Sequence, residues 1–459
     1  MNENSLPRTR ISPVRLIPIS FFIAIVIGTL LLLLPFSSAS GEKTDLLTAL
    51  FTATTSVCVT GLVVVDTYSH WSSFGHVVIL LLIQMGGLGV VAVGSMFMIV
   101  GKKKFTLADR VLLNDSLNVE KKRGLLSFLI RIFRGTFIVE GIGAVLYAFK
   151  FIPLYGPLKG LSTSIFHSIS AFCNAGIDII GPDSMIGFQE SPYLLCVTMT
   201  LIILGGLGFV VWFDLVDGIR HGIRNHLNPR RIFRHLPVHT KLVLSVTGFL
   251  ILSGGIVFFI VENHNPGTIG GMGLSGKIFN SLFQSVTLRT AGFASIPQQN
   301  LTEASCMISY ILMFIGGSPV GTAGGVKTVT AVLVFMNSLC YIRGKREIVI
   351  FKRRVPVESL RKAAAVFFVS FFVVLLMTVL LLARGGIDLT DGLFEIVSAL
   401  GTVGLSRNLT SSLDRVGRIL VVISMYLGRI GPISMAVFFA KAAGNENKVH
   451  HADGTFYVG

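Results

Sequence analysis

Val57-Cys58-Val59-Thr60-Gly61-Leu62 is the first of four similar short segments in this chain of 459 residues. The other three are Cys173-Asn174-Ala175-Gly176-Ile177, Arg289-Thr290-Ala291-Gly292-Phe293 and Gly401-Thr402-Val403-Gly404-Leu405. Their glycines follow one another at intervals of 115, 116 and 112 residues. Related segments at a nearly constant interval indicate an internally repeated architecture. The sequence therefore predicts four structural repeats in one chain.

The same parts surround each glycine segment. An apolar first span comes before it, at roughly 16–35, 125–151, 238–261 and 364–383. A shorter semi-polar stretch leads into it, at about 45–57, 161–172, 276–288 and 390–400. A second apolar span follows it, at roughly 74–100, 191–216, 304–340 and 415–440. Because a helix needs about 20 residues to cross a hydrocarbon core of about 30 Å, the semi-polar stretch predicts a half-helix that enters the membrane and turns back.

A glycine-rich tetrad recurs inside the second span of every repeat. The four tetrads are Gly86-Gly87-Leu88-Gly89, Gly205-Gly206-Leu207-Gly208, Gly316-Gly317-Ser318-Pro319 and Gly428-Arg429-Ile430-Gly431. Their second residues lie 26, 30, 25 and 25 residues after the segment glycines, which gives the repeat a second register. Since small residues let membrane helices approach closely, we expect the first two tetrads to be packing positions rather than ligand sites.

Composition and charge place the chain in a membrane. Hydrophobic residues make up 52% of it and charged residues 14%, whereas soluble proteins carry roughly 25% charged residues. The formal net charge is +16, and 28 of the 39 Lys and Arg residues lie in five patches between or beside the apolar spans. This pattern is typical of cytoplasmic loops; a nucleic-acid-binding surface is the weaker interpretation, and we expect no nucleic-acid partner. The predicted location is the cell membrane, with several spans and both termini cytoplasmic.

The predicted fold class is an all-α membrane protein with four tandem span–pore-helix–filter-loop–span repeats around one central pore. The predicted boundaries are a cytoplasmic N-terminus 1–15, repeat one 16–100, a basic loop 101–124, repeat two 125–217, a basic loop 218–237, repeat three 238–340, a basic loop 341–363, repeat four 364–443 and a cytoplasmic tail 444–459.

Half-helices followed by glycine segments indicate an ion pore. Irregular backbone at membrane depth survives only where protein buries it or where it lines a wet cavity. Four such segments around one axis can present a ring of carbonyl oxygens that replaces the hydration shell of K⁺. Glycine reaches positive φ without strain, and the C-terminal ends of the half-helices offer partial negative charge. The predicted K⁺-coordinating filter comprises Val59, Thr60, Gly61, Asn174, Ala175, Gly176, Thr290, Ala291, Gly292, Thr402, Val403 and Gly404.

The second span of repeat three contains five glycines and a proline within residues 316–327. Each Gly costs a helix up to about 1 kcal/mol and Pro about 3 kcal/mol, so the helix should break there. We interpret residues 316–327 as an intramembrane loop that blocks the pore below the filter; a kinked packing interface is the alternative. The predicted gate residues are Gly316, Gly317, Ser318, Pro319, Gly321, Thr322, Ala323, Gly324, Gly325, Lys327 and Arg429.

Two cations accompany the intramembrane loop. Arg429 lies within the second span of repeat four, where an Arg is costly and usually marks an ion path or a buried partner. We hypothesise that Arg429 raises an electrostatic barrier below the filter and donates hydrogen bonds to loop carbonyls. Lys327 either does the same or extends to the inner membrane surface. Glu140, also within a predicted span, either contacts the pore or a partner, or pairs with a buried hydroxyl.

The chain resembles the superfamily of bacterial Trk and Ktr potassium transporters and their plant and fungal relatives, most of all the Ktr-type membrane subunit. Residues 57–62, Thr290-Ala291-Gly292-Phe293 and the glycine-rich 316–327 carry the resemblance, which covers about 15–445. It implies a fused analogue of the potassium-channel pore, with the family's filter glycines at Gly61, Gly176, Gly292 and Gly404. Because related plant proteins with a Ser at the first position prefer Na⁺, Gly61 favours K⁺. Each segment lacks the second glycine of a potassium-channel filter, which implies imperfect exclusion of Na⁺.

The resemblance also implies partners. It predicts a homodimer with one pore in each protomer and a cytoplasmic ring of nucleotide-binding regulatory subunits. No covalent cofactor is expected; K⁺ is the transported ion, and a role for Na⁺ as activator or co-ion stays open. A secondary transporter of another cation or solute is the alternative function, although such transporters usually have inverted or paired repeats. The chain offers no convergent set of catalytic side chains, so we do not expect an enzyme.

Overall fold

The computed structural model describes residues 13–100 and 125–431. Most of the predicted N-terminus 1–15, the predicted loop 101–124, the end of predicted repeat four from residue 432 and the predicted tail 444–459 lie outside the described residues. Within these two ranges the chain is mostly helical, which confirms the predicted fold class. The one sheet in this part is an antiparallel pair of two-residue strands, β1 (Val349–Ile350) and β2 (Arg353–Arg354).

The first span of each repeat is one continuous helix. These helices are α1 (Pro13–Leu32), α7 (Leu125–Tyr155), α12 (Val238–Glu262) and α16 (Val357–Leu382). By length and composition, α7, α12 and α16 can each cross a membrane alone. Large apolar side chains point outward from them, such as Phe249 on α12 and Phe372 on α16. Exposed apolar rows would cause aggregation in water, so lipid is the solvent that suits this surface.

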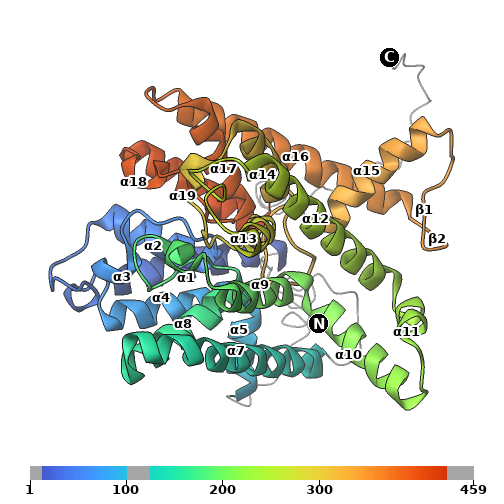
Figure 1. Cartoon of the computed structure of the whole chain (residues 1–459), viewed down its shortest axis with the longest axis horizontal. Helices are drawn as coiled ribbons and strands as arrows, with labels where there is room; N and C mark the ends of the chain where they lie inside the picture. The colour runs from blue at the N-terminus through green and yellow to red at the C-terminus, as the bar shows by residue number, and fades with distance from the viewer. Residues whose placement is uncertain (1–12, 101–124, 432–459) are drawn as a thin grey trace, which may run out of the picture.

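Four shorter helices follow the first spans. They are α2 (Leu46–Cys58), α8 (Pro157–Cys173), α13 (Leu274–Thr287) and α17 (Leu389–Gly401). Each packs against the first span of its own repeat, as α7 and α8 show in Figure 1. With 13 to 17 residues at about 1.5 Å per residue, none can cross a hydrocarbon core of about 30 Å. We refer to these four as the pore helices.

The second span is broken in the first three repeats. Gly89 separates α4 (Ser73–Leu88) from α5 (Val90–Val100), and Gly208 separates α9 (Pro192–Leu207) from α10 (Phe209–Arg224) with a bend of 100°. Residues 315–327 separate α14 (Glu303–Phe314) from α15 (Thr328–Ile342). In repeat four, α19 (Arg415–Ile430) ends just before Gly431. The sequence predicted only the break in repeat three; the tetrad glycines Gly89, Gly208 and Gly431 have φ of 91°, 87° and 92°, which no helix accommodates.

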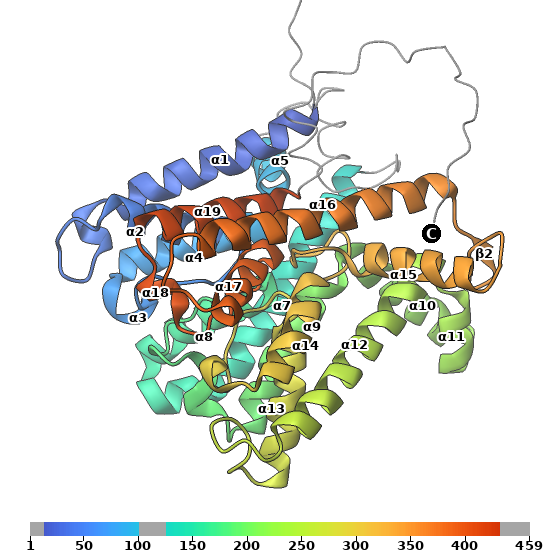
Figure 2. The ribbon, with the colours of Figure 1, turned by 90° about the horizontal axis from the view of Figure 1, so that it is seen from above.

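The basic segments between the repeats are partly structured. Where the sequence predicted a loop at 218–237, α10 continues to Arg224 and α11 (Pro229–His235) follows. Within 341–363, the β1–β2 hairpin is followed by α16, which begins at Val357. Figures 1 and 2 show α10, α11 and the hairpin at the same end of the molecule. The remaining short helices are α3 (Thr67–His70), α18 (Leu409–Ser412) and 3-10 turns at Pro35–Ser37, Ser184–Phe188 and Gln298–Asn300.

Candidate ion pore

The four segment glycines form a closed ring in chain order. A Cβ atom added to any of them would meet the carbonyl oxygen of the residue that precedes the next repeat's glycine. The distance would be 2.5 Å from Gly61 and 2.6 Å from Gly176. The four contacts are Gly61 with Ala175, Gly176 with Ala291, Gly292 with Val403 and Gly404 with Thr60. Segments more than a hundred residues apart therefore surround one axis, as the repeat predicts.

Left-handed backbone alternates with ordinary backbone in every segment. The segment glycines have φ between 64° and 103°. The residues two positions earlier also have positive φ: Val59 at 55°, Asn174 at 59°, Thr290 at 68° and Thr402 at 50°. This alternation turns successive carbonyl oxygens toward one side of the chain and the N–H groups toward the other. Non-glycine residues in this conformation cost about 1–3 kcal/mol each, and such strain typically persists at functional sites.

Backbone N–H groups of the segments bond back into the pore helices. The residue before each segment glycine donates to a carbonyl in the last turn of its helix, over 2.8 Å or 2.9 Å. These bonds run from Thr60 to Thr55, from Ala175 to Ser170, from Ala291 to Thr287 and from Val403 to Ser398. These bonds fix the backbone of each segment to its own pore helix.

A hydroxyl in each pore helix braces its own segment. Thr55 accepts the N–H of Gly61 at 2.9 Å, and Ser398 accepts that of Gly404 at 3.0 Å. In repeats two and three the hydroxyl donates instead, from Ser170 to the Ile177 carbonyl at 2.5 Å and from Thr287 to the Phe293 carbonyl at 2.7 Å. The sequence analysis missed these four braces. Their signal was a Ser or Thr five or six residues before each segment glycine.

Three further hydroxyls at the ring are buried and have no hydrogen-bond partner among the described residues. They are Oγ1 of Thr60, Thr290 and Thr402, and the last two occupy the same position in their repeats. Buried polar groups nearly always have a partner, so these oxygens are candidate ligands for water or a cation. The C-terminal ends of the pore helices add partial negative charge on the same side. The arrangement can therefore bind a cation that has lost its water.

The intramembrane loop 316–327 closes on itself at its base. The Gly316 N–H donates to the Val326 carbonyl at 2.9 Å, and the Thr328 N–H donates to the Gly317 carbonyl at 3.1 Å. The glycines and the proline do break the helix here, as the sequence predicts. The loop is nevertheless fixed by backbone hydrogen bonds rather than left without partners.

The loop body lies against repeats two and four on the side of the ring where the pore helices end. Ser318 N–H donates to the Gly206 carbonyl at 2.9 Å, and the Thr322 hydroxyl donates to the Phe172 carbonyl at 3.1 Å. Gly324 lies so close to the Thr402 hydroxyl that a Cβ atom there would overlap it. The loop thus contacts the ring directly.

Arg429 and Lys327 both donate to carbonyls of this loop. Arg429 donates to Thr322 O at 2.6 Å and also to Gly86 O in repeat one. Lys327 Nζ donates to Ala323 O at 2.7 Å and to Gly324 O at 3.5 Å. Of the two alternatives for Lys327, the structure shows the contact with the loop. Both side chains thus hold the loop through its carbonyl oxygens.

Glu140 lies behind the ring rather than on it. Its carboxylate accepts a hydrogen bond from Gln84 Nε2 of repeat one at 3.1 Å, and its other oxygen lies 3.8 Å from Cys173 Sγ. The Ser168 hydroxyl donates to the Glu140 backbone carbonyl at 2.6 Å. Glu140 therefore joins α7, α4 and the end of pore helix α8, and its carboxylate pairs with an amide rather than with a buried hydroxyl, which was one of the two alternatives.

The first glycine of three tetrads packs against its own pore helix. A Cβ atom on Gly86, Gly205 or Gly428 would overlap the carbonyl oxygen of Val57, Phe172 or Leu400, each four residues before a segment glycine. Gly87 in turn packs against Cys173 of the next repeat, where a Cβ atom would lie 2.5 Å from the sulfur. These contacts confirm the packing role expected for the first two tetrads.

Two exposed carboxylates lie at the starts of helices in repeat four, Asp388 before α17 and Asp414 before α19. Backbone hydrogen bonding, chiefly from Thr390, lowers the pKa of Asp388 at the start of α17. The Gly417 N–H and the Arg384 guanidinium lower the pKa of Asp414 at the start of α19. Both side chains are therefore charged at neutral pH and cap the first turns of α17 and α19.

An apolar helical shell around four short pore helices, whose glycine segments meet in one ring, defines a membrane protein of the fused four-repeat pore class. Comparison with known proteins agrees. The family model TrkH, described as a cation transport protein, matches residues 9–450. This chain belongs to that family, so the resemblance inferred from the segments is confirmed.

Relatives of the chain match over nearly its whole length. The potassium/sodium uptake protein NtpJ of Enterococcus hirae is 38% identical and covers 97% of this chain and 96% of its own. The Ktr system potassium uptake protein B of Bacillus subtilis is 36% identical, with 98% and 97% covered. The crystal structure of the potassium transporter TrkH from Vibrio parahaemolyticus matches with a TM-score of 0.73 at 16% identity, covering 95% of this chain and 86% of that one, which shows a shared fold.

Proposed function

We propose that this chain carries K⁺ into the cell through its four-repeat pore, as the membrane subunit of a Ktr-type system. The closed ring of segment glycines carries this proposal, because four inward-facing carbonyl sets are the arrangement that replaces the hydration shell of K⁺. Two relatives at 36% and 38% identity are named as potassium uptake proteins, which supports the same cargo here.

In this proposal the segments form the selectivity filter. The coordinating backbone belongs to Val59, Thr60, Gly61, Asn174, Ala175, Gly176, Thr290, Ala291, Gly292, Thr402, Val403 and Gly404. The alternating φ signs support it, since they turn consecutive carbonyls to one side. The hydroxyls of Thr290 and Thr402 add oxygens at the same level in two repeats. K⁺ is thus cargo rather than a cofactor.

The intramembrane loop is the proposed gate. The close approach of Gly324 to the Thr402 side chain, next to the filter, supports this proposal. Arg429 and Lys327 hold the loop in this position and oppose the passage of a cation while it stays there. Opening requires the loop to move away from the ring and exchange these hydrogen bonds for others.

Na⁺ is the second candidate cargo. The relative from Enterococcus hirae is named as a potassium/sodium uptake protein. In each segment of this chain, neither of the two residues after the segment glycine is a second glycine, so the filter is short. Na⁺ as a permeating ion, activator or co-ion therefore belongs in every transport test.

The proposed assembly is a homodimer in the cell membrane, with both termini cytoplasmic and a ring of nucleotide-binding regulatory subunits on the cytoplasmic side. The name of the Bacillus subtilis relative, protein B of a Ktr system, supports a multi-subunit system. The shared end of α10, α11 and the β1–β2 hairpin carries several arginines and offers a docking face.

Growth and flux test the proposal. The gene should restore growth of a K⁺-uptake-deficient bacterium on low K⁺, and reconstituted vesicles should take up Rb⁺ and K⁺ faster than Na⁺. Vesicles that show no flux of any of the three ions, at normal insertion and with a regulatory partner present, would remove K⁺ uptake as the function.

A further inference from the structure

Arg289 is a buried cation between the repeat-three filter and the intramembrane loop. It lies two residues after the last residue of pore helix α13 and directly before the filter residue Thr290. Only 8% of its surface is exposed. Its guanidinium donates to the carbonyl oxygen of Gly316, the first residue of the loop, at 3.4 Å. The side chain of Arg289 thus contacts the loop, while its backbone belongs to the filter segment of repeat three.

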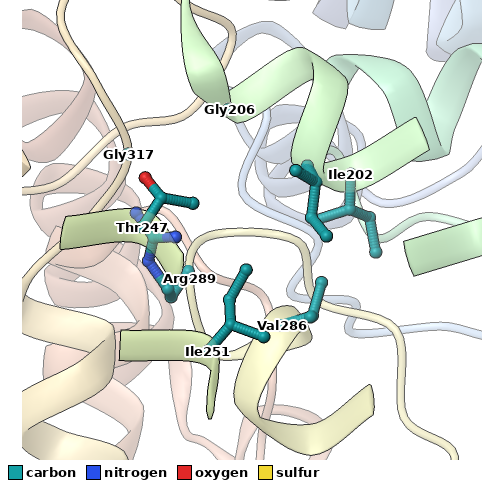
Figure 3. Close-up of a pocket in the computed structure, with 8 residues that line it drawn as sticks. Ile202, Gly206, Thr247, Ile251, Val286, Arg289 and Gly317 are labelled. Atoms are coloured by element: carbon teal, nitrogen blue, oxygen red, sulfur yellow. The ribbon is translucent and has the colours of Figure 1, made fainter. Parts of the chain in front are cut away.

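The guanidinium borders a small cavity that contains no counter-charge. The lining residues are Ile202, Ile203, Gly206, Thr247, Ile251, Val286, Arg289 and Gly317, none of them acidic. Figure 3 shows Arg289 beside Thr247 at this cavity. No hydrogen-bond partner for its Nε occurs among the residues that the structure describes. Since an Arg stays charged and a buried charge depends on its few acceptors, the Gly316 carbonyl is costly to lose.

We propose that Arg289 is a positioning residue that links the repeat-three filter to the loop. The inference rests on the proposed function, because the loop must gate the pore for the link to matter. Arg429 and Lys327 bond the middle and far parts of the loop, at Thr322 and at Ala323 and Gly324. Arg289 bonds its beginning. Movement of the loop breaks the Arg289 bond, and a change in the filter backbone moves Arg289; such coupling is reciprocal.

Hydrogen–deuterium exchange of the loop amides tests the link without a transport measurement. In R289Q, backbone amides of residues 316–328 should exchange hydrogen for deuterium about tenfold faster than in the unaltered protein. The amides of α12, which also borders the cavity, should keep their rates. R289K retains the charge but not the planar fork, so its increase should be smaller. R384Q is the control, because Arg384 is exposed and pairs with Asp414 on the outer side.

Flux in two backgrounds then separates a link from simple packing. With the loop intact, R289Q should raise Rb⁺ flux several-fold. In a variant whose loop is shortened within 316–325, the same substitution should change flux little, because the loop that it releases is already displaced. R384Q should leave flux unchanged in both backgrounds.

Unchanged loop exchange in R289Q, or an equal effect of R289Q on flux in both backgrounds, would overturn the link. If R289Q does not insert into the membrane, R289K is the deciding variant. Loop exchange in R289K equal to that of the unaltered protein would then contradict the proposal. If loop exchange is faster in R289Q but the reconstituted protein transports none of K⁺, Rb⁺ and Na⁺, the proposed function is wrong and the link between Arg289 and the loop stands. Normal K⁺ flux with unchanged exchange would remove the link alone.

Discussion

Gly61 faces the carbonyl oxygen of Ala175 so closely that a Cβ atom on Gly61 would lie 2.5 Å from it. The contact joins repeat one to repeat two at the ring, and its equivalents join the other repeats in the same order. Any side chain at this position must push a neighbouring carbonyl away from its place. The φ of 103° at Gly61 adds strain for every residue other than glycine.

Substitution of Gly61 by Ser should therefore reduce ion selectivity. The displaced Ala175 carbonyl widens the ring, and we expect the ratio of K⁺ to Na⁺ flux to fall about tenfold, which corresponds to about 1.4 kcal/mol. Paired Rb⁺ and Na⁺ uptake in vesicles measures the ratio. G41A is the matched control, because Gly41 also has positive φ, at 74°, but a Cβ atom there meets nothing within 4 Å. A ratio in G61S equal to that in G41A would contradict the filter assignment.

The Thr55 brace gives a second prediction. Thr55→Val keeps the shape of the side chain but leaves the Gly61 N–H without its acceptor, which costs about 1–3 kcal/mol at a buried site. We expect a lower K⁺ to Na⁺ flux ratio and a melting temperature lowered by several degrees. Thr200→Val is the control, because the exposed Thr200 hydroxyl bonds only within its own helix. Equal behaviour of the two variants would show that the brace does not support the filter.

Substitution of Arg429 tests the role of its contact with the loop. Arg429→Ala removes both the bond to Thr322 and the positive charge beside the loop. We expect Rb⁺ flux to rise about tenfold, since a hydrogen bond to a charged group contributes about 1.5–3 kcal/mol. Tracer uptake at matched expression measures it. Unchanged flux would take Arg429 out of the mechanism.

Replacement of Glu140 tests its position behind the ring. Glu140→Leu leaves Gln84 without its partner and should lower the melting temperature, because a buried amide loses its hydrogen bond. Glu140→Gln can still accept from Gln84 and should be closer to the unaltered protein. If both variants lose flux at unchanged melting temperature, Glu140 acts in transport rather than in packing.

Acid should weaken the cap at the start of α19 in repeat four. The pKa of Asp414 is lowered in the folded protein by the Gly417 N–H and then by Arg384. A lowered folded pKa means that the stabilisation is present above the unfolded value of about 3.9 and is lost as pH falls through the folded pKa. In Asp414→Asn, which keeps a cap acceptor, the melting temperature should fall less between about pH 6 and about pH 3 than in the unaltered protein. Asp183→Asn is the control, because Asp183 makes no capping bond.

Much of this architecture follows from glycine spacing alone. The four segments at Gly61, Gly176, Gly292 and Gly404 predict the repeat from their spacing, and the length of the stretch before each one predicts a half-helix. The ring follows from the repeat, because four equivalent segments can surround one axis. The loop at 316–327 follows from its five glycines and one proline. These patterns limit backbone conformation before any tertiary contact forms.

The remaining features depend on neighbours distant in sequence. Beside the break at Gly208, the Phe209 N–H donates to the Val320 carbonyl of the loop at 2.9 Å, a contact between repeats two and three. Lys327 could equally have extended to the membrane surface, and only the carbonyls of Ala323 and Gly324 decide its direction. No role for Arg289 was predicted from the sequence, although it directly precedes a filter residue. The reason is that its partner in the contact, Gly316, lies 27 residues further along the chain.

Anomalous diffraction from crystals of the protein grown in Rb⁺ tests most directly whether the ring binds the transported ion. We predict a peak on the axis, in direct contact with carbonyl oxygens of all four segments around Gly61, Gly176, Gly292 and Gly404. Rb⁺ bound elsewhere, with no peak inside the ring, would contradict the account.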